Sequence, residues 1–191
     1  MLLPVVSLGL ACTDRTDAGT VTVGAAASLT SAFSEIGDAF MAQRSGAKVV
    51  FEFGSSSDVV KGINEGAPTD VFASADTKNM DKLVAGTGVA AEPRTFATNE
   101  LQIIVAKGNP KGLTSVADLA APGVLVVTCS PEVPIGGYTQ QVFDAAGVDV
   151  SPASLEENVK GIVTKVSLGE ADAGVVYRTD VLAAGDKAEG V

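Results

Sequence analysis

The chain contains no histidine and no tryptophan, and only two of its 191 residues are cysteines, Cys12 and Cys129. A serine hydrolase of the common type needs a histidine base beside its nucleophile, and a zinc site needs a cluster of histidine or cysteine ligands. This composition supplies neither. A serine–lysine dyad would need a lysine such as Lys48 or Lys61 beside a reactive serine, and the spacing does not indicate one. We therefore do not expect an enzyme.

Basic and aromatic residues are also scarce. Lysine and arginine number 13 against 23 acidic residues, which gives a formal charge of -10, and aromatics make up 5% of the chain. This charge repels nucleic acid and anionic membrane surfaces at long range, so we expect neither as a partner. A small anion is not excluded, because exposed charges more than about 8 Å away are largely screened at physiological salt.

We interpret residues 1–19 as a signal or lipoprotein segment with a linker. The apolar run MLLPVVSLGLA leads directly to Cys12 and is followed by the polar TDRTDAGT. The run resembles the hydrophobic region of a bacterial signal peptide that ends in a lipobox, which predicts lipidation of Cys12. No basic residue precedes the run, and Leu8 stands one position too early for the motif, so a ragged N-terminus is the alternative. If Cys12 is lipidated, Cys129 has no partner and is expected to be a small buried hydrophobe.

From Thr20 onward, short apolar runs alternate with segments of helical periodicity, which predicts α/β architecture with parallel sheets covered on both faces. The segment from Pro93 to Thr98 interrupts this alternation. We therefore predict a first lobe over residues 20–98 and a second over residues 99–191. The expected strands are residues 20–27, 48–54, 70–75, 101–108, 124–129 and 171–177, and the expected helices are residues 28–44, 57–65, 76–84, 114–120, 138–146 and 158–168.

Ser28 and Ser56 each stand where an apolar strand gives way to a helix. A helix start offers unpaired N–H groups and a partial positive charge, so it binds anions without a cationic side chain. One such serine is usually a simple N-cap, but two in successive strand-to-helix turns indicate an anion site. In the second half, the amides of Ile135 and Val159 lie at helix starts. Tyr177 ends an apolar strand, where its phenol either packs or binds.

Several segments together resemble the molybdate-binding proteins of bacterial ABC uptake systems, in that family's order and over residues 20–181. They are AAASLTSAF, FGSSSDV, APTDVFASADTKNMD, PEVPIGGY and ADAGVVYRTDV. The resemblance implies a type II periplasmic-binding-protein fold, with two lobes that are each a mostly parallel sheet flanked by helices and a ligand cleft between them. It implies that an oxyanion is held by hydrogen bonds alone, without a coordinated metal cation or a cofactor.

By position, the resemblance implies five ligand contacts. Ser28 and Ser56 would supply hydroxyl and backbone N–H donors, Ile135 and Val159 backbone N–H donors, and Tyr177 its phenol. Relatives continue past the Tyr177 region with a strand that returns to the first lobe and a terminal helix. The stretch up to Val191 would then only begin that return, and the C-terminal elements of the first lobe would be missing.

The implied function is that of an extracytoplasmic binding protein, periplasmic or a cell-surface lipoprotein. It would act as a monomer, capture molybdate and also tungstate, and deliver them to the membrane subunits of an ABC permease. The protein itself would contact the membrane only through an N-terminal lipid anchor. A receptor for sulfate or another tetrahedral oxyanion is the alternative. A hydrolase is less favoured, and an intracellular anion sensor is disfavoured by the N-terminal apolar run and by the lack of a basic DNA-binding segment.

Overall fold

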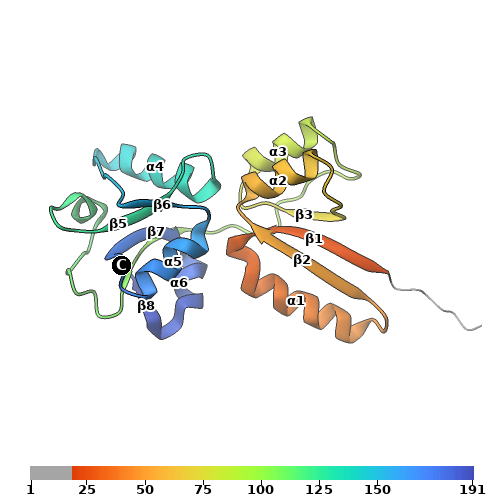
Figure 1. Cartoon of the computed structure of the whole chain (residues 1–191), viewed down its shortest axis with the longest axis horizontal. Coiled ribbons are helices and arrows are strands. Elements are labelled where there is room, and N and C mark those ends of the chain that lie inside the picture. The colour runs from red at the N-terminus through yellow and green to blue at the C-terminus, as the bar shows by residue number, and fades with distance from the viewer. Residues whose placement is uncertain (1–18) are drawn as a thin grey trace, which may run out of the picture.

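A computed structural model describes residues 19–191, which form two α/β lobes side by side (Figure 1). Cys12 and the rest of the predicted signal segment lie outside the described residues. Within residues 19–191, no helix combines the length and apolar character that crossing a membrane requires.

The first lobe is a three-stranded parallel sheet with helices on both faces (Figure 1). Helix α1 covers one face, and α2 and α3 cover the other. Two cap side chains fix helix starts, since Ser55 accepts from the Asp58 amide before α2 and Asp76 accepts from the Asn79 amide before α3. The elements are β1 (Thr20–Ala26), η1 (Ala27–Leu29), α1 (Thr30–Gln43), β2 (Lys48–Gly54), α2 (Ser56–Asn64), β3 (Val71–Ala73) and α3 (Thr77–Ala85), in sheet order β2-β1-β3.

The second lobe is a five-stranded sheet in the order β6-β5-β7-β4-β8. Strand β5 runs parallel to β6 and β7, whereas β4 runs antiparallel to β7 and β8, so this sheet is mixed. Its elements are β4 (Leu101–Ala106), η2 (Val116–Ala120), β5 (Val126–Cys129), α4 (Pro134–Ala146), β6 (Ser154–Glu156), α5 (Val159–Ser167), β7 (Ala173–Tyr177), α6 (Arg178–Ala184), η3 (Gly185–Lys187) and β8 (Ala188–Gly190).

Apart from the unforeseen strand β6 and shifts of a few residues at element ends, the observed elements differ from the sequence-based expectations in three places. Helix α4 begins at Pro134 rather than at Tyr138, because proline is well placed at a first helical position and Gly136 packs tightly against the Ser130 carbonyl. Residues 116–120 form a 3-10 turn instead of an α-helix. The residues after Tyr177, expected to begin a return to the first lobe, form α6, η3 and β8, and β8 pairs with β4 in the second sheet.

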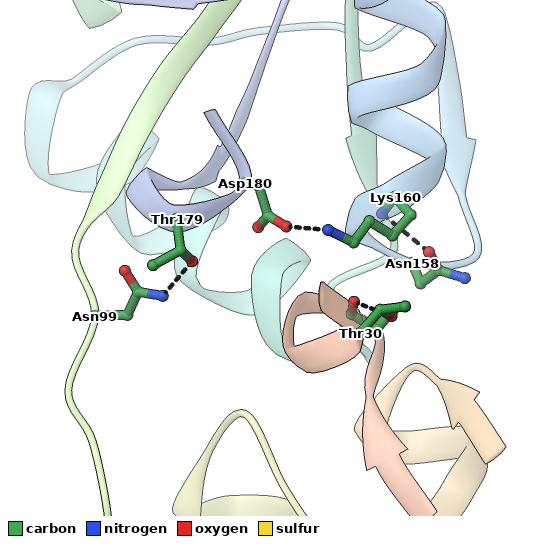
Figure 2. A network of polar contacts seen from close by, with 7 residues as sticks. Thr30, Asn99, Asn158, Lys160, Thr179 and Asp180 are labelled. Atoms are coloured by element: carbon green, nitrogen blue, oxygen red, sulfur yellow. Dashed lines mark hydrogen bonds and ion pairs between the residues drawn. The ribbon is translucent and has the colours of Figure 1, made fainter. Parts of the chain in front are cut away.

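The lobes are joined by residues 86–100, which contain no helix or strand, and they also touch directly. Ala27 of the first lobe belongs to the main buried apolar cluster of the second lobe, and Ala75 packs against that cluster. The connecting segment is tied to the start of α6, where the Asn99 side-chain amide donates to the Thr179 hydroxyl over 2.8 Å (Figure 2). The connecting segment is therefore anchored to the second lobe, and the two lobes are in direct apolar contact.

Candidate functional site

The structure brings all five predicted site residues to one pocket between the lobes. Ser28 and Ser56 line it from the first lobe, and Ile135, Val159 and Tyr177 line it from the second. The pocket encloses about 250 Å³, part of it open to solvent. The other lining residues are Ala26, Ala27, Gly54, Ser55, Ala75, Val133, Pro134 and Asn158. Their convergence makes a shared site, while the individual ligand contacts stay a prediction.

The lining carries no charged side chain among the described residues. Helices α2, α4 and α5 each border the pocket with their first residue, Tyr177 directly precedes α6, and η1 adds a short turn. Helix starts carry unpaired backbone N–H groups and a positive partial charge. The pocket can therefore attract and orient an anion with neutral donors alone.

The Ser56 hydroxyl accepts one hydrogen bond within the chain and remains available as a donor. Its side chain is buried at 1% exposure, and its Oγ accepts a hydrogen bond of 2.9 Å from the Ala75 amide. A hydroxyl that accepts one bond still has an O–H to donate. The neighbouring Ser55 caps α2 by accepting from the Asp58 amide over 3.2 Å, so capping does not use the Ser56 side chain.

Ser28 lies in the middle of η1, directly after the buried end of β1. This turn is closed by the Thr30 hydroxyl, which donates to the Ala27 carbonyl over 2.7 Å (Figure 2). Ser28 is half-buried. The strand and the closed turn therefore fix the place where Ser28 meets the pocket.

The starts of α4 and α5 present the two predicted backbone donors. Helix α4 has no side-chain cap, and because Pro134 lacks an N–H, Ile135 carries the first amide of the helix. In α5, the Asn158 side chain accepts from the Lys160 amide over 3.0 Å and leaves the earlier Val159 amide without that cap (Figure 2). Sequence reasoning missed Asn158 as a pocket residue, although an asparagine directly before a helix is a recognisable capping signal.

Tyr177 supplies the strongest sign of a ligand. The residue is only 7% exposed, and its hydroxyl is buried with no hydrogen-bond partner among the described residues. Burial raises the pKa of Tyr177, and the nearby Tyr138 and Asp76 raise it further, so the phenol keeps its proton at neutral pH. A buried polar group without a partner costs about 1–3 kcal/mol, and such groups are rare in folded proteins. A bound anion would satisfy this donor.

Two α/β lobes that enclose a pocket between helix starts define a two-lobed solute-binding protein. The chain belongs to the family of bacterial extracellular solute-binding proteins, which it matches over residues 21–191. It is 45% identical over 170 residues to the molybdate-binding protein ModA of Mycobacterium tuberculosis, an alignment that covers 89% of this chain and 65% of that protein. It is 34% identical over 177 residues to ModA of Escherichia coli, covering 87% of this chain and 68% of that protein.

A solved structure is similar in three dimensions as well. The periplasmic molybdate-binding protein of Azotobacter vinelandii superposes with a TM-score of 0.71 at 26% identity, covering 90% of this chain and 77% of that one. The comparison agrees with the predicted two-lobed fold, which is confirmed. The chain spans 65% of the length of the mycobacterial relative.

Proposed function

We propose that this chain captures molybdate, and tungstate in the same way, for delivery to an ABC importer outside the cytoplasm. The observation that carries the proposal is the buried, unpartnered Tyr177 hydroxyl in a pocket whose described lining holds no charged side chain. The names of the mycobacterial and Escherichia coli relatives support molybdate as the ligand. Membership of an extracellular family supports the location, and a lipid on Cys12 would be the anchor.

Neutral donors suit a fully deprotonated tetrahedral anion. A hydrogen bond to a charged acceptor contributes roughly 1.5–3 kcal/mol net, so about seven such bonds can offset desolvation and lobe closure. A protonated oxyanion would present a donor to these donors and would be rejected. The pocket would therefore select its ligand by shape and protonation state rather than by charge alone.

Closure of the lobes would convert binding into a transport signal. The predicted contacts come from both lobes, so a bound anion stabilises the closed arrangement over the open one. A membrane permease that recognises the closed form would then receive loaded protein. We expect the binding protein to act as a monomer in this step.

Calorimetric titration with molybdate, tungstate, sulfate and phosphate tests the proposal. Molybdate and tungstate should bind most tightly, and Ser28→Ala and Ser56→Ala should each weaken molybdate binding by about tenfold or more. Ser57→Ala is a matched control, because Ser57 contacts the Ser55 hydroxyl at 3.1 Å and does not line the pocket. No binding of molybdate to the wild-type chain would refute the function. Undiminished affinity in both Ser28→Ala and Ser56→Ala would refute the site.

A further inference from the structure

A buried ion pair lies next to the pocket and is not explained by the predicted ligand contacts. The Lys160 Nζ is 2.9 Å from Asp180 Oδ1, and the Asp180 side chain is completely buried while that of Lys160 is 32% exposed. Figure 2 shows the two side chains pointing toward each other from α5 and α6. Lys160 directly follows Val159, and Asp180 lies in the first helical turn after Tyr177. The pair thus connects the two helices that follow two of the predicted contacts.

The position of Lys160 is unfavourable on local grounds. A cation in the first turn of a helix is repelled by the positive end of the helix dipole, whereas an acidic residue there is stabilised, as Asp180 is in α6. The first turn of α5 also borders the pocket through Asn158 and Val159. An uncompensated ammonium here would add a full positive charge beside an otherwise neutral anion site.

Asp180 compensates that charge with a carboxylate that is itself buried. Burial raises the pKa of Asp180 above its ordinary value, and the hydrogen bond and charge of Lys160 act against that rise by favouring the ionised form. The Asp180 Oδ2 atom has no hydrogen-bond partner among the described residues, and besides Lys160 the Tyr177 backbone amide favours the ionised form, so the carboxylate depends mainly on Lys160. The pair has no net charge as long as both partners are present.

From this arrangement we infer that Asp180 determines specificity: it holds and neutralises the Lys160 ammonium, so that the pocket cannot use it to bind anions indiscriminately. The inference rests on the proposed function of the same pocket. A free positive charge strengthens the binding of any anion, including those that match the neutral donors poorly. The neutral pair leaves discrimination to the hydrogen-bond geometry.

The same helix offers a matched control pair. Lys165 lies 2.7 Å from Glu156, and its side chain is also 32% exposed. It stands in the last turn of α5, five residues beyond Lys160, which is about 7.5 Å further along the helix axis. Glu156→Gln therefore changes the net charge by the same amount as Asp180→Asn, but it frees Lys165 in the last turn of α5 instead of Lys160 in the first.

Calorimetric titration with sodium sulfate and sodium molybdate, at low and at high sodium chloride, tests the inference. Asp180→Asn should raise the sulfate affinity about tenfold at low salt, and high salt should abolish the gain. The double variant Lys160→Met/Asp180→Asn removes both charges of the pair, so these two positions again carry no net charge. Its sulfate affinity should return to the wild-type value. Glu156→Gln should leave it unchanged.

The single variant Lys160→Met changes the local charge in the opposite direction from Asp180→Asn. It keeps the test decisive if Asp180→Asn does not fold. It leaves Asp180 without its counter-ion, and at alkaline pH, where the carboxylate remains ionised, it should weaken sulfate and molybdate binding alike. Unchanged or lower sulfate affinity in folded Asp180→Asn, or unchanged affinity for both anions in Lys160→Met at alkaline pH, would overturn the inference alone, provided that the wild-type chain binds molybdate. Absence of molybdate binding to the wild type would overturn the proposed function as well.

Discussion

Replacing Tyr177 with phenylalanine should separate ligand binding from folding. The ring packs in the main apolar cluster of the second lobe, and its hydroxyl is buried without a partner among the described residues. Phenylalanine keeps the ring contacts and removes a group whose unsatisfied burial costs about 1–3 kcal/mol. The free energy of unfolding without ligand should stay the same or rise by about 1 kcal/mol. The molybdate affinity should fall about 10- to 150-fold, which corresponds to the loss of one hydrogen bond of roughly 1.5–3 kcal/mol to a charged acceptor.

Two measurements on the same samples check that Tyr177→Phe lowers molybdate affinity without lowering stability. Urea unfolding without ligand gives the stability, and calorimetric titration with molybdate gives the affinity. Tyr138→Phe is the matched control, because Tyr138 is the only other tyrosine and does not line the pocket. A Tyr177→Phe chain that binds molybdate within about threefold of the wild type would refute the reasoning. So would a loss of more than about 1 kcal/mol of stability without ligand, since it would mean that the hydroxyl has a folding partner.

Three further perturbations have distinct expected outcomes. Ser56→Ala should lower both molybdate affinity and, by about 1 kcal/mol, the free energy of urea unfolding, because its Oγ also accepts a backbone hydrogen bond. Gly136→Ala should lower stability by about 2 kcal/mol or more, since a Cβ would overlap the Ser130 carbonyl, whereas Gly62→Ala in α2 has room and should raise it by about 0.5–1 kcal/mol. Burial raises the pKa of Cys129 from 9.0 to about 12, so its stabilising contribution is complete below pH 9 and is lost as the pH rises toward 12. The alkaline decline in unfolding free energy should therefore be shallower in Cys129→Ala.

The first lobe was largely predictable because local signals mark its elements. The helix expected at residues 57–65 is observed at Ser56–Asn64, with Ser55 as its cap and Gly66 just beyond its end. The alternation of apolar runs and helical periodicity predicted the α/β architecture, while the division into two lobes came from the interruption at residues 93–98 and from the family resemblance. Such signals lie within a few residues of each other and do not depend on the rest of the fold.

Elements that depend on distant partners were not predictable. Strand β6 has three residues and exists because it pairs with β5, and β8 likewise pairs with β4. Three residues contain no usable periodicity. The early start of α4 was hidden by Gly136 and Gly137, which suggest a loop in the sequence, although Gly136 serves close packing against Ser130.

The candidate site also contains residues that local sequence patterns identify and residues that they do not. Ser28 and Ser56 could be singled out from strand-to-helix turns alone, whereas Ile135, Val159 and Tyr177 needed the family resemblance to become more than plausible. The support that orients Ser56 could not be foreseen, because the Ala75 amide that binds its Oγ is 19 residues away in sequence. Local patterns therefore indicate where donors stand, and only the folded chain shows what holds them.

The alanine contacts between the lobes determine how the size preference of this protein can change. Ala27 and Ala75 are where the first lobe reaches the apolar cluster of the second, and their side chains are single methyl groups. A larger side chain at either position would push against that cluster and hold the lobes apart, and it would also occupy part of the pocket, which both alanines line. One substitution outside the five predicted contacts would then reshape the proposed anion pocket, so its size preference can change without any loss of donors.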